Sequence, residues 1–453
     1  MVNWRSLFPG LFPEKNELAP GIYHYRQELD HKQMRLHLRV EENGEGLLTV
    51  NASGVIHMNE SATLLAKLIL DGTPTDKALH QVRGLYRVSE SLLHQDYDRM
   101  RTMIETLRDS EDACPVFRLN AERIPLFEKA PSAPYRVDLA LTYQCNNECH
   151  HCYNETRQKG NALSIFQWED VLEKLWAVGV PHVCFTGGEA TLHHDLTHLI
   201  KKAEDIGLVT GLLTNGRKLA NSAYVHELVD AGLDHVQITI ESHSAKVHDN
   251  MVSANGAHAE TVAGIRNAVA EDLYLVTNTT LTEKNASEIT DTLAFIASLG
   301  VRNVAFNCLI NTGKAPQSGI ELAADALADV LMEIRDTCDE LGLRMIWYSP
   351  TRYCDLDPTE LEMGAKRCTA ASYSMCIEPD GMVLPCQSYY EPVGNILELS
   401  WKEIWYSERF EAIRQRRDVS DECAACDRFE ICGGGCPLAD GKRFLCSNSA
   451  GEV

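Results

Sequence analysis

The sequence predicts an α/β protein built on a parallel sheet, with a small winged-helix-like domain before it and a cysteine-rich domain after it. Three observations support this prediction. Strand-like and helix-like segments alternate six times across residues 135–348. Residues 34–110 have the pattern of a short β hairpin followed by three helices, and residues 349–453 carry closely spaced cysteines.

The composition excludes two classes of protein. The chain has 453 residues, of which 44% are hydrophobic and 24% charged, so we expect two to four globular domains. The formal net charge of −23 argues against a nucleic-acid partner, because neutralising phosphates requires clustered Lys and Arg. There is no apolar run of about 18 residues and no signal peptide, so we expect a cytoplasmic protein without a membrane partner. In that compartment sixteen cysteines indicate metal ligands before disulfides.

Two proline-rich segments are predicted to lack regular structure. The first is the N-terminal segment, residues 1–33, which contains Pro9, Pro13 and Pro20. The second is residues 111–134, predicted as a linker. The two segments therefore bound the first predicted domain.

Residues 34–110 are predicted to form that small domain. Its strands are expected at Arg35–Val40, Leu47–Val50 and Val55–Met58. Asn59 can cap a helix over Glu60–Leu70, which the following Asp-Gly pair would end. Two more helical patterns follow before residue 110.

Residues 135–348 are predicted to form six βα units. The expected strands are Val137–Leu141, Val183–Thr186, Val209–Leu213, Val236–Ile240, Leu273–Thr277 and Val301–Phe306. The expected helices include Trp168–Val178, Ala223–Ala231 and Ile289–Leu299. Such units form a parallel sheet with right-handed crossovers, and chemistry is expected at the C-terminal ends of the strands.

Three cysteines follow the first of these strands. Cys145, Cys149 and Cys152 have the spacing C-x3-C-x2-C, in a loop expected to leave the end of the strand. A four-iron cluster takes one ligand at each corner, so three thiolates leave one iron open for a small chelating molecule. Zinc is the alternative metal, with His150 or His151 as its fourth ligand.

A second group of seven cysteines begins after residue 349. Its members are Cys368, Cys386, Cys423, Cys426, Cys432, Cys436 and Cys446. A pair of zinc ribbons is the alternative interpretation, because C-x2-C is a common zinc element. Four other thiols have no ligand spacing and are interpreted as buried apolar fillers, namely Cys114, Cys184, Cys308 and Cys338.

The three-cysteine spacing resembles the cluster-binding motif of the radical S-adenosylmethionine (radical SAM) enzymes. The resemblance implies a partial (β/α)6 barrel, a [4Fe-4S] cluster with one open iron, and S-adenosylmethionine as cofactor. The cluster would cleave that cofactor reductively to an adenosyl radical, which abstracts a hydrogen atom from the substrate. An electron donor such as ferredoxin or flavodoxin is implied as a partner.

Further motifs on the predicted barrel fit the same family. Gly187, Gly188 and Glu189 follow the second strand and resemble the turn that holds the methionine amino group, with the glycines allowing close backbone approach. Asn215 lies in a turn that recurs in the family after the third strand. Beyond the fourth strand, Thr239 and Glu241 stand where relatives contact the ribose, although the arginine that is often found nearby is absent.

The seven-cysteine pattern resembles the SPASM auxiliary-cluster domain of radical SAM peptide-modifying enzymes and implies two auxiliary iron–sulfur clusters. By that resemblance the first cluster is held by Cys368, Cys386 and Cys436. Its fourth ligand is left open between Cys376, Cys354, a substrate thiolate and none. The second cluster would be held by Cys423, Cys426, Cys432 and Cys446. Gln387 stands where the sulfatase-activating branch has a catalytic aspartate, which counts against that branch.

Residues 34–110 resemble the PqqD-like domain that binds leader peptides in ribosomal-peptide (RiPP) maturation, where the leader adds as a strand to a sheet edge. The resemblances together imply a RiPP maturase that docks a precursor peptide through its leader and forms a thioether or carbon–carbon crosslink. Two alternatives remain open. One is oxidative tailoring of a small molecule or cofactor, as in haem-modifying relatives, and the other is a non-enzymatic electron carrier or redox sensor.

Overall fold

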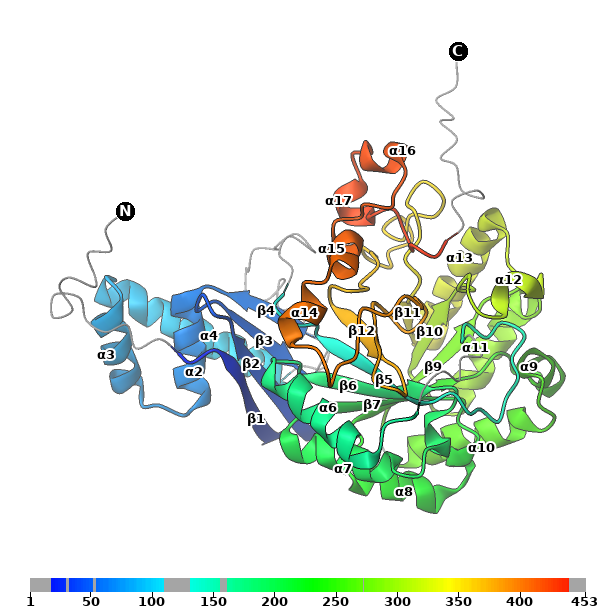
Figure 1. Cartoon of the computed structure of the whole chain (residues 1–453), viewed down its shortest axis with the longest axis horizontal. Coiled ribbons are helices and arrows are strands. Elements are labelled where there is room, and N and C mark those ends of the chain that lie inside the picture. Colours follow the sequence, from blue (N-terminus) through cyan, green and yellow to red (C-terminus); the bar gives the residue numbers. More distant parts are fainter. Residues whose placement is uncertain are drawn as a thin grey trace, which may run out of the picture. The chain divides into compact units, whose positions relative to one another are not determined.

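The computed structural model describes residues 18–29, 32–51, 54–109, 131–154, 161–271 and 273–439. These residues form two compact units, shown in Figure 1. Unit 1 comprises Met1–Ser132 and Leu175–Pro181, and unit 2 comprises Ala133–Lys174 and His182–Val453. Most of the predicted linker, residues 111–134, lies outside the described residues.

The described residues of unit 1 form an antiparallel sheet and three helices. The strands, in spatial order, are β1 (Gly21–Leu29), β2 (Lys32–Val40), β3 (Gly46–Val50) and β4 (Gly54–Met58). The helices are α2 (Glu60–Leu70), α3 (Thr75–Leu85) and α4 (Glu90–Asp109). As predicted, Asn59 caps α2, its side chain accepting from the backbone N–H of Ala62 at 3.0 Å. The predicted order of strands followed by three helices is therefore confirmed.

The prediction of an irregular N-terminal segment is wrong for residues 21–29. These residues form β1, which pairs with β2 along its whole length. The physical reason lies in the side chains, because Tyr23 and Tyr25 pack against the apolar core of the unit and both favour extended backbone. The prolines that suggested irregular structure all lie before the strand.

Unit 2 is built on a nine-stranded sheet with the order β11-β10-β9-β8-β7-β6-β5-β12-β13. Strands β5 to β11 are parallel, and their bounds are β5 (Arg136–Thr142), β6 (His182–Gly187), β7 (Val209–Thr214), β8 (His235–Thr239), β9 (Tyr274–Thr280), β10 (Asn303–Asn307) and β11 (Arg344–Trp347). The six predicted strands correspond to β5 through β10. The seventh parallel strand, β11, was not predicted.

The C-terminal region also contributes to this sheet. Strand β12 (Ser374–Ile377) pairs in parallel with β5, and β13 (Val383–Leu384) pairs antiparallel with β12. The sequence had placed residues 349–453 in a domain of their own. Three of the four β12 residues are apolar or thiol side chains that are fully buried, so β12 covers an edge of β5 that would otherwise be open.

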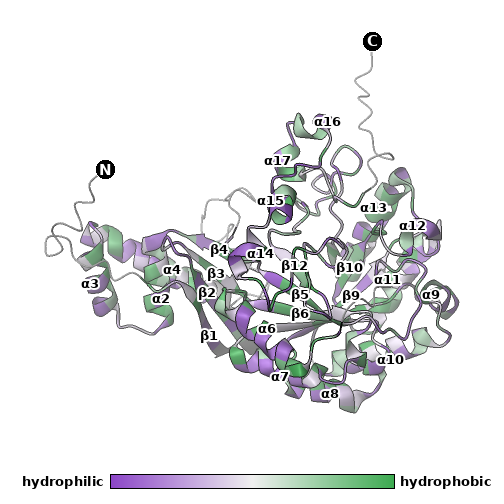
Figure 2. Cartoon of the chain, viewed as in Figure 1, coloured by the Kyte–Doolittle hydropathy of each residue, from purple (hydrophilic) through white to green (hydrophobic). Residues whose placement is uncertain are grey.

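Helices follow most of these strands. They are α6 (Ile165–Ala177), α7 (Leu196–Ile206), α8 (Ser222–Asp230), α9 (Ala245–Val252), α10 (Ala257–Ala270), α11 (Ile289–Ser298), α12 (Ala315–Ser318) and α13 (Ala324–Leu341). Figure 2 shows hydrophilic and hydrophobic residues alternating along them, as expected for helices with one buried and one solvated face. Among the described residues, no helix combines the length and apolarity needed to cross a bilayer.

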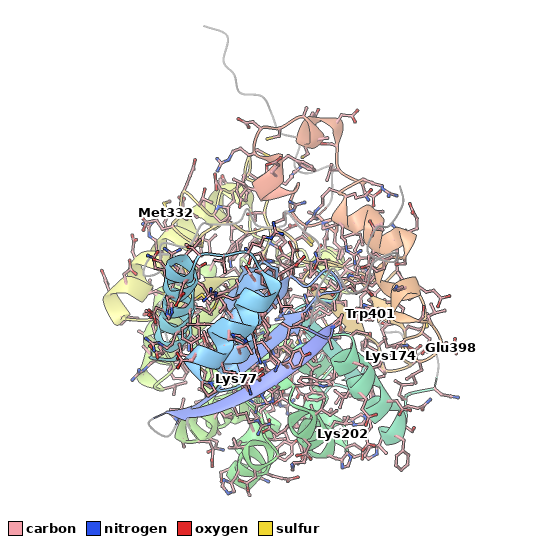
Figure 3. The ribbon with its side chains drawn as sticks, turned by 90° about the vertical axis from the view of Figure 1, so that its left-hand side faces the viewer. Lys77, Lys174, Lys202, Met332, Glu398 and Trp401 are labelled. Atoms are coloured by element: carbon pink, nitrogen blue, oxygen red, sulfur yellow. The ribbon has the colours of Figure 1, made fainter. Side chains whose placement is uncertain are left out.

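Four short helices carry the C-terminal part of unit 2, namely α14 (Trp401–Trp405), α15 (Glu408–Arg414), α16 (Asp421–Ala424) and α17 (Phe429–Cys432). Lys174 on α6 joins this part to the barrel, because its ammonium donates to the carbonyls of Ile396 and Leu399 at 2.5 and 2.6 Å. Figure 3 shows Lys174 beside the segment that carries Glu398 and Trp401. The cysteine-rich region is therefore attached to the barrel by direct hydrogen bonds as well as by β12.

Candidate iron–sulfur and cofactor site

The three-cysteine loop leaves the C-terminal end of β5 at Thr142, as the sequence predicted. Burial raises the pKa of Cys145, Cys149 and Cys152, and the neighbouring Cys152 thiol adds to the rise at the other two. Cys145 also raises the pKa of Cys149, and a bound cation would favour the anionic forms of all three thiols. The donor set therefore fits an iron cluster bound through three thiolates.

The geometry of the loop disfavours zinc. His150 Nε2 lies 3.1 Å from Ser253 Oγ, and His151 Nε2 lies 2.9 Å from Glu241 Oε1, whereas His151 Nδ1 is buried without a hydrogen-bond partner. Among the described residues, the groups whose ligand atoms all lie within 4.8 Å of one another do not include the three thiols. Sulfur ligands about 2.3 Å from a tetrahedral zinc would lie about 4 Å apart.

The turn after β6 is hydrogen-bonded to the cysteine loop. The backbone N–H of Gly188 donates to Thr142 O at 2.7 Å, and that of Glu189 donates to Gln144 O at 2.8 Å. A Cβ atom at Gly187 would lie 2.2 Å from Thr142 O, and one at Gly188 would lie 2.5 Å from Gln144 O. Close backbone approach was predicted for these glycines, and in the structure the partner is the cysteine loop itself.

The Glu189 carboxylate is buried and holds two turns together. Its Oε1 accepts from the hydroxyls of Thr191 and Thr214 at 2.7 and 2.6 Å. Its Oε2 accepts from the backbone N–H of Asn215 at 2.8 Å. The carboxylate thus positions the turns after β6 and β7, and its contact with a ligand ammonium stays a prediction.

The turn after β7 is also hydrogen-bonded to the cysteine loop. Asn215 Nδ2 donates to Asn146 Oδ1 at 2.6 Å. Arg217 donates to the carbonyl of Asn146 and, at 2.9 Å, to Asn147 Oδ1, while its Nε donates to Glu260 on α10 at 2.5 Å. Sequence reasoning identified Asn215 but missed Arg217, which lies only two residues further on.

Thr239 and Glu241 lie where β8 ends. Thr239 is half-buried, but Glu241 is fully buried, with one oxygen on His151 and the other accepting from the backbone N–H of Thr280 at 3.0 Å. Burial alone would lower the pKa of His151, but the Glu241 charge and hydrogen bond raise it overall. Glu241 therefore anchors the cysteine loop, and the ribose contacts of both residues stay predictions.

A further segment, after β10, contacts the end of the cysteine loop. The backbone N–H of Lys314 donates to Cys152 O at 2.8 Å. Gly313 has φ +63°, and a Cβ there would lie 2.5 Å from Cys152 O. The Lys314 charge also lowers the pKa of Cys152, partly offsetting the effect of burial. No motif in the sequence pointed to this pair of residues.

The structure brings together three cysteines predicted for the first auxiliary cluster. Burial raises the pKa of Cys386, and the nearby Cys368 and Cys436 raise it further. Burial and Cys368 likewise raise the pKa of Cys436 to about 12. These three thiols, from distant parts of the sequence, thus lie within electrostatic reach of one another.

Cys423 and Cys432 of the second auxiliary set lie on α16 and α17, and Cys426 lies in the connection between these helices. Cys426 is exposed, Cys423 is half-buried and Cys432 is buried, and the backbone N–H of Tyr353 donates to Cys432 Sγ at 3.4 Å. Cys446, the fourth predicted ligand, lies outside the described residues. The ligand set of this cluster stays a prediction.

The two further candidate ligands of the first auxiliary cluster occupy different surroundings. Cys376 lies on β12 opposite Asp138, and its thiol donates to the carbonyl of Ile377 at 3.8 Å. Burial raises its pKa, followed by the charges of Asp138 and Cys386, so the thiol lies near the first auxiliary set. Cys354 is disulfide-bonded in the structure, so it is not present as a thiol there. The fourth ligand of the first cluster stays open.

One hydrogen bond links the two cysteine regions directly. Tyr153, which follows Cys152, donates through its hydroxyl to Gln387 Oε1 at 3.2 Å. Gln387 follows Cys386 of the first auxiliary set. A single side-chain hydrogen bond therefore joins the residue after Cys152 to the residue after Cys386. These two cysteines are predicted ligands of different clusters.

Two more hydrogen bonds support this link. Tyr390 donates to Asn154 Oδ1 at 3.0 Å, and Tyr143 donates to Glu378 Oε1 at 2.6 Å. Both pairs join the cysteine loop to the segments around β12 and β13 and are largely buried. The relative position of the two cysteine regions is thus determined by side-chain contacts that sequence analysis did not anticipate.

Comparison with known proteins identifies the family. The model of the radical SAM superfamily matches residues 139–296, and that of an iron–sulfur cluster-binding domain, SPASM, matches residues 368–427. A PqqA peptide cyclase of Rhodopseudomonas palustris is 30% identical over 318 residues, which are 67% of this chain and 82% of that protein. The chain belongs to the radical SAM superfamily. Its cofactors are accordingly S-adenosylmethionine and iron–sulfur clusters.

Other relatives differ in function. An AdoMet-dependent heme synthase of Methanosarcina barkeri is 26% identical over 321 residues, covering 67% of this radical SAM protein and 91% of that enzyme. The crystal structure of Streptococcus suis SuiB bound to precursor peptide SuiA superimposes with a TM-score of 0.66 at 17% identity, covering 92% of this chain and 96% of that one. The structure of anSMEcpe with bound AdoMet gives a TM-score of 0.53 at 18% identity, covering 67% and 89% of the two chains.

The extent of the SuiB match is informative about unit 1. Residues 133–453 make up fewer than three quarters of the chain, so a match over 92% must include most of the residues before them. The fold shared with SuiB therefore extends beyond the radical SAM barrel and the auxiliary-cluster region.

Proposed function

We propose that the protein is a radical SAM peptide-modifying enzyme, a RiPP maturase that installs a thioether or carbon–carbon crosslink in a precursor peptide. The observation that carries this proposal is the near full-length fold match to SuiB, a protein crystallised with its precursor peptide. The identity of several relatives as PqqA peptide cyclases supports it, since their named substrate is also a peptide.

The residues of the chain have defined tasks under this proposal. Cys145, Cys149 and Cys152 would hold a [4Fe-4S] cluster which, with S-adenosylmethionine on its open iron, supplies an adenosyl radical. Glu189 and Arg217 keep the cysteine loop in place through the turns after β6 and β7.

A cluster held by the auxiliary cysteines would accept the electron that crosslinking releases. Forming one bond between two peptide groups removes two hydrogen atoms, one of which the adenosyl radical takes. The remaining electron and proton need acceptors, and Cys368, Cys386 and Cys436 would hold the cluster that takes the electron. The Tyr153–Gln387 hydrogen bond keeps this region at a constant position relative to the cysteine loop.

The sheet of unit 1 would bind the leader. Its edges are β1 and β4, and an extended peptide can add to such an edge through backbone hydrogen bonds. A cavity of about 260 Å³ lies between α2 and α4, lined by residues that include Ile69, Tyr97 and Arg101, and could receive a leader side chain. This assignment makes unit 1 a PqqD-like recognition domain.

The test uses the full-length protein, prepared anaerobically with its clusters reconstituted and reduced. The substrate is the short peptide encoded beside the gene, mixed with S-adenosylmethionine. We expect a product lighter than the peptide by two hydrogen atoms for each crosslink. A peptide of unchanged mass, with S-adenosylmethionine cleaved, would contradict the proposal.

A second candidate is oxidative tailoring of a small molecule, which the heme synthase match supports. That relative matches 67% of this chain, too little to include all of both units. Under this alternative unit 1 has no peptide to bind. Titrating the full-length protein with the labelled leader peptide separates the two, because saturable binding supports the peptide substrate and its absence favours the small molecule. A reduced protein that cleaves no S-adenosylmethionine would instead indicate an electron carrier.

A further inference from the structure

A separate group of potential metal ligands lies at the other end of the barrel strands. His182 Nε2 lies 2.8 Å from His235 Nε2 and 3.3 Å from Cys184 Sγ, and the three atoms all fall within 4.8 Å of one another. His182 and His235 are the first residues of β6 and β8. The group therefore lies at the N-terminal ends of the strands, whereas the cysteine loop lies at their C-terminal ends.

The sheet register explains why these three side chains meet. Cys184 is aligned with Gly211 on β7, and Gly211 is aligned with His235 on β8, so all three positions face the same side of the sheet. His182 precedes Cys184 by two residues and shares that face. A Cβ at Gly211 would lie 2.3 Å from the His235 ring and 2.7 Å from Cys184 Sγ. The missing side chain on β7 thus lets His235 reach across to β6.

Hydrogen bonding alone satisfies this arrangement poorly. Between two neutral imidazoles only one Nε2 can donate, and the other must accept. If His182 donates to His235, its Nε2 has no lone pair left for the Cys184 thiol. If it accepts, two donors compete for one lone pair. A metal ion placed between the three atoms would use a lone pair from each of them.

We propose that His182, Cys184 and His235 form a zinc site, with a water molecule as the fourth ligand. Imidazole nitrogen and thiolate sulfur are both common zinc ligands. Ligand atoms of a tetrahedral zinc lie about 3.3 Å apart for two nitrogens and about 3.6 Å apart for nitrogen and sulfur. The separations of His182 from His235 and from Cys184, 2.8 and 3.3 Å, would therefore widen, and that of Cys184 from His235 is within 4.8 Å.

The charges around the site are compatible with a divalent ion. The Arg136 guanidinium opposes a cation here, but Asp138 forms an ion pair with it at 3.1 Å. Zinc binding would displace the thiol proton of Cys184 and release it to solvent.

The zinc would have one position occupied by water, unlike closed structural sites with four protein ligands. It would join β6 to β8 across the glycine on β7, at the end of the barrel remote from the proposed chemistry. This assignment changes the interpretation of Cys184, which the sequence predicted to be an apolar filler. The residue is fully buried as predicted, but its sulfur lies beside an imidazole nitrogen.

The test is the metal content of the full-length, anaerobically prepared protein. We expect about one zinc per chain in addition to the iron, falling at least about tenfold in Cys184→Ser while the iron content is retained. Serine keeps a hydroxyl that can hydrogen-bond to His182, so a hydrogen-bond network without metal would tolerate the change. Cys338→Ser, at a buried thiol on α13, is the matched control and should keep its zinc.

X-ray absorption at the zinc edge of the wild-type protein decides the case if Cys184→Ser does not fold. We expect two nitrogen ligands at about 2.0–2.1 Å and one sulfur at about 2.3 Å. Protein without zinc, equal zinc in Cys184→Ser, or a zinc shell made only of sulfur would each overturn the proposal. The last result would place the zinc in the cysteine loops instead. None of these outcomes depends on the peptide-modifying activity.

Discussion

The cysteine loop after β5 and the cysteine segment on α16 and α17 are held in very different ways. The loop receives hydrogen bonds from the turns after β6, β7 and β8 and from the segment after β10, through residues such as Gly188, Arg217, Glu241 and Lys314. The α16–α17 segment consists of two four-residue helices, with Cys426 exposed. We therefore expect the barrel to preform the cysteine loop and the α16–α17 segment to gain order when it binds metal.

Replacing a ligand in each region should produce the largest contrast. In Cys149→Ala the first cluster loses a ligand, so we expect cleavage of S-adenosylmethionine to fall to the level without enzyme. In Cys426→Ala we expect cleavage to continue while formation of modified peptide falls. Chromatographic assays of 5′-deoxyadenosine and of product peptide measure the two quantities. Equal loss of cleavage in both variants would contradict the division of roles.

The next largest contrast is expected in hydrogen exchange when iron is removed, because the two cysteine segments should respond differently. By hydrogen exchange, we expect the amides of Glu148 and His150 to remain protected in the iron-free protein, because they donate to the carbonyls of Val252 and Met251 on α9 at 2.9 and 3.1 Å. Residues 420–439 should exchange much faster without iron than with it. Equal changes in both segments would show that the barrel does not preform the loop.

A charge-neutralising change at Glu189 tests how much its carboxylate stabilises the turns after β6 and β7. Glu189→Gln replaces a buried acceptor of several hydrogen bonds by an amide that can accept at only one atom. We expect the free energy of unfolding to fall by about 2–4 kcal/mol. The matched control is Glu422→Gln on exposed α16, for which we expect a change within about 0.5 kcal/mol. Denaturant unfolding of both variants measures these changes. A similar loss of unfolding free energy in the two variants would show that the Glu189 carboxylate does not stabilise the turns.

The smallest effect is expected at the link between the regions. Tyr153→Phe removes the hydroxyl that donates to Gln387 and should cost about 0.5–1.5 kcal/mol. We expect more S-adenosylmethionine to be cleaved per modified peptide, because the two cysteine regions are less rigidly joined. Tyr406→Phe, at an exposed tyrosine, is the control. If Tyr153→Phe cleaves the same amount of S-adenosylmethionine per modified peptide as the wild-type protein, the Tyr153–Gln387 hydrogen bond does not couple cleavage to peptide modification.

The sequence predicted the parts of the protein that depend on local pattern. The strands β5 to β10 follow from apolar periodicity, and the cysteine loop and the Gly187–Glu189 turn follow from spacing. The missed elements depend on distant pairing. Strand β12 has few residues and gains its stability by covering β5, and Lys314 reaches Cys152 from a loop more than 150 residues away.

The same limit applies to the contacts of two further residues. Glu241 was predicted as a ribose ligand, which stays a prediction, and in the structure its carboxylate also contacts His151 and the backbone of Thr280. Cys184 had no ligand spacing along the chain, because its neighbours His182 and His235 come together only through the register of three strands. Contacts of this kind are absent from any one-dimensional pattern.

The most direct test of the account is electron paramagnetic resonance of the reduced protein with and without S-adenosylmethionine. The auxiliary ligands Cys386 and Cys426 are replaced by alanine, so that the cluster on Cys145, Cys149 and Cys152 dominates the spectrum. We predict a [4Fe-4S] signal whose g values shift when S-adenosylmethionine is added, because the cofactor binds the open iron. A signal that does not change, or protein that holds zinc without iron at this loop, would contradict the account.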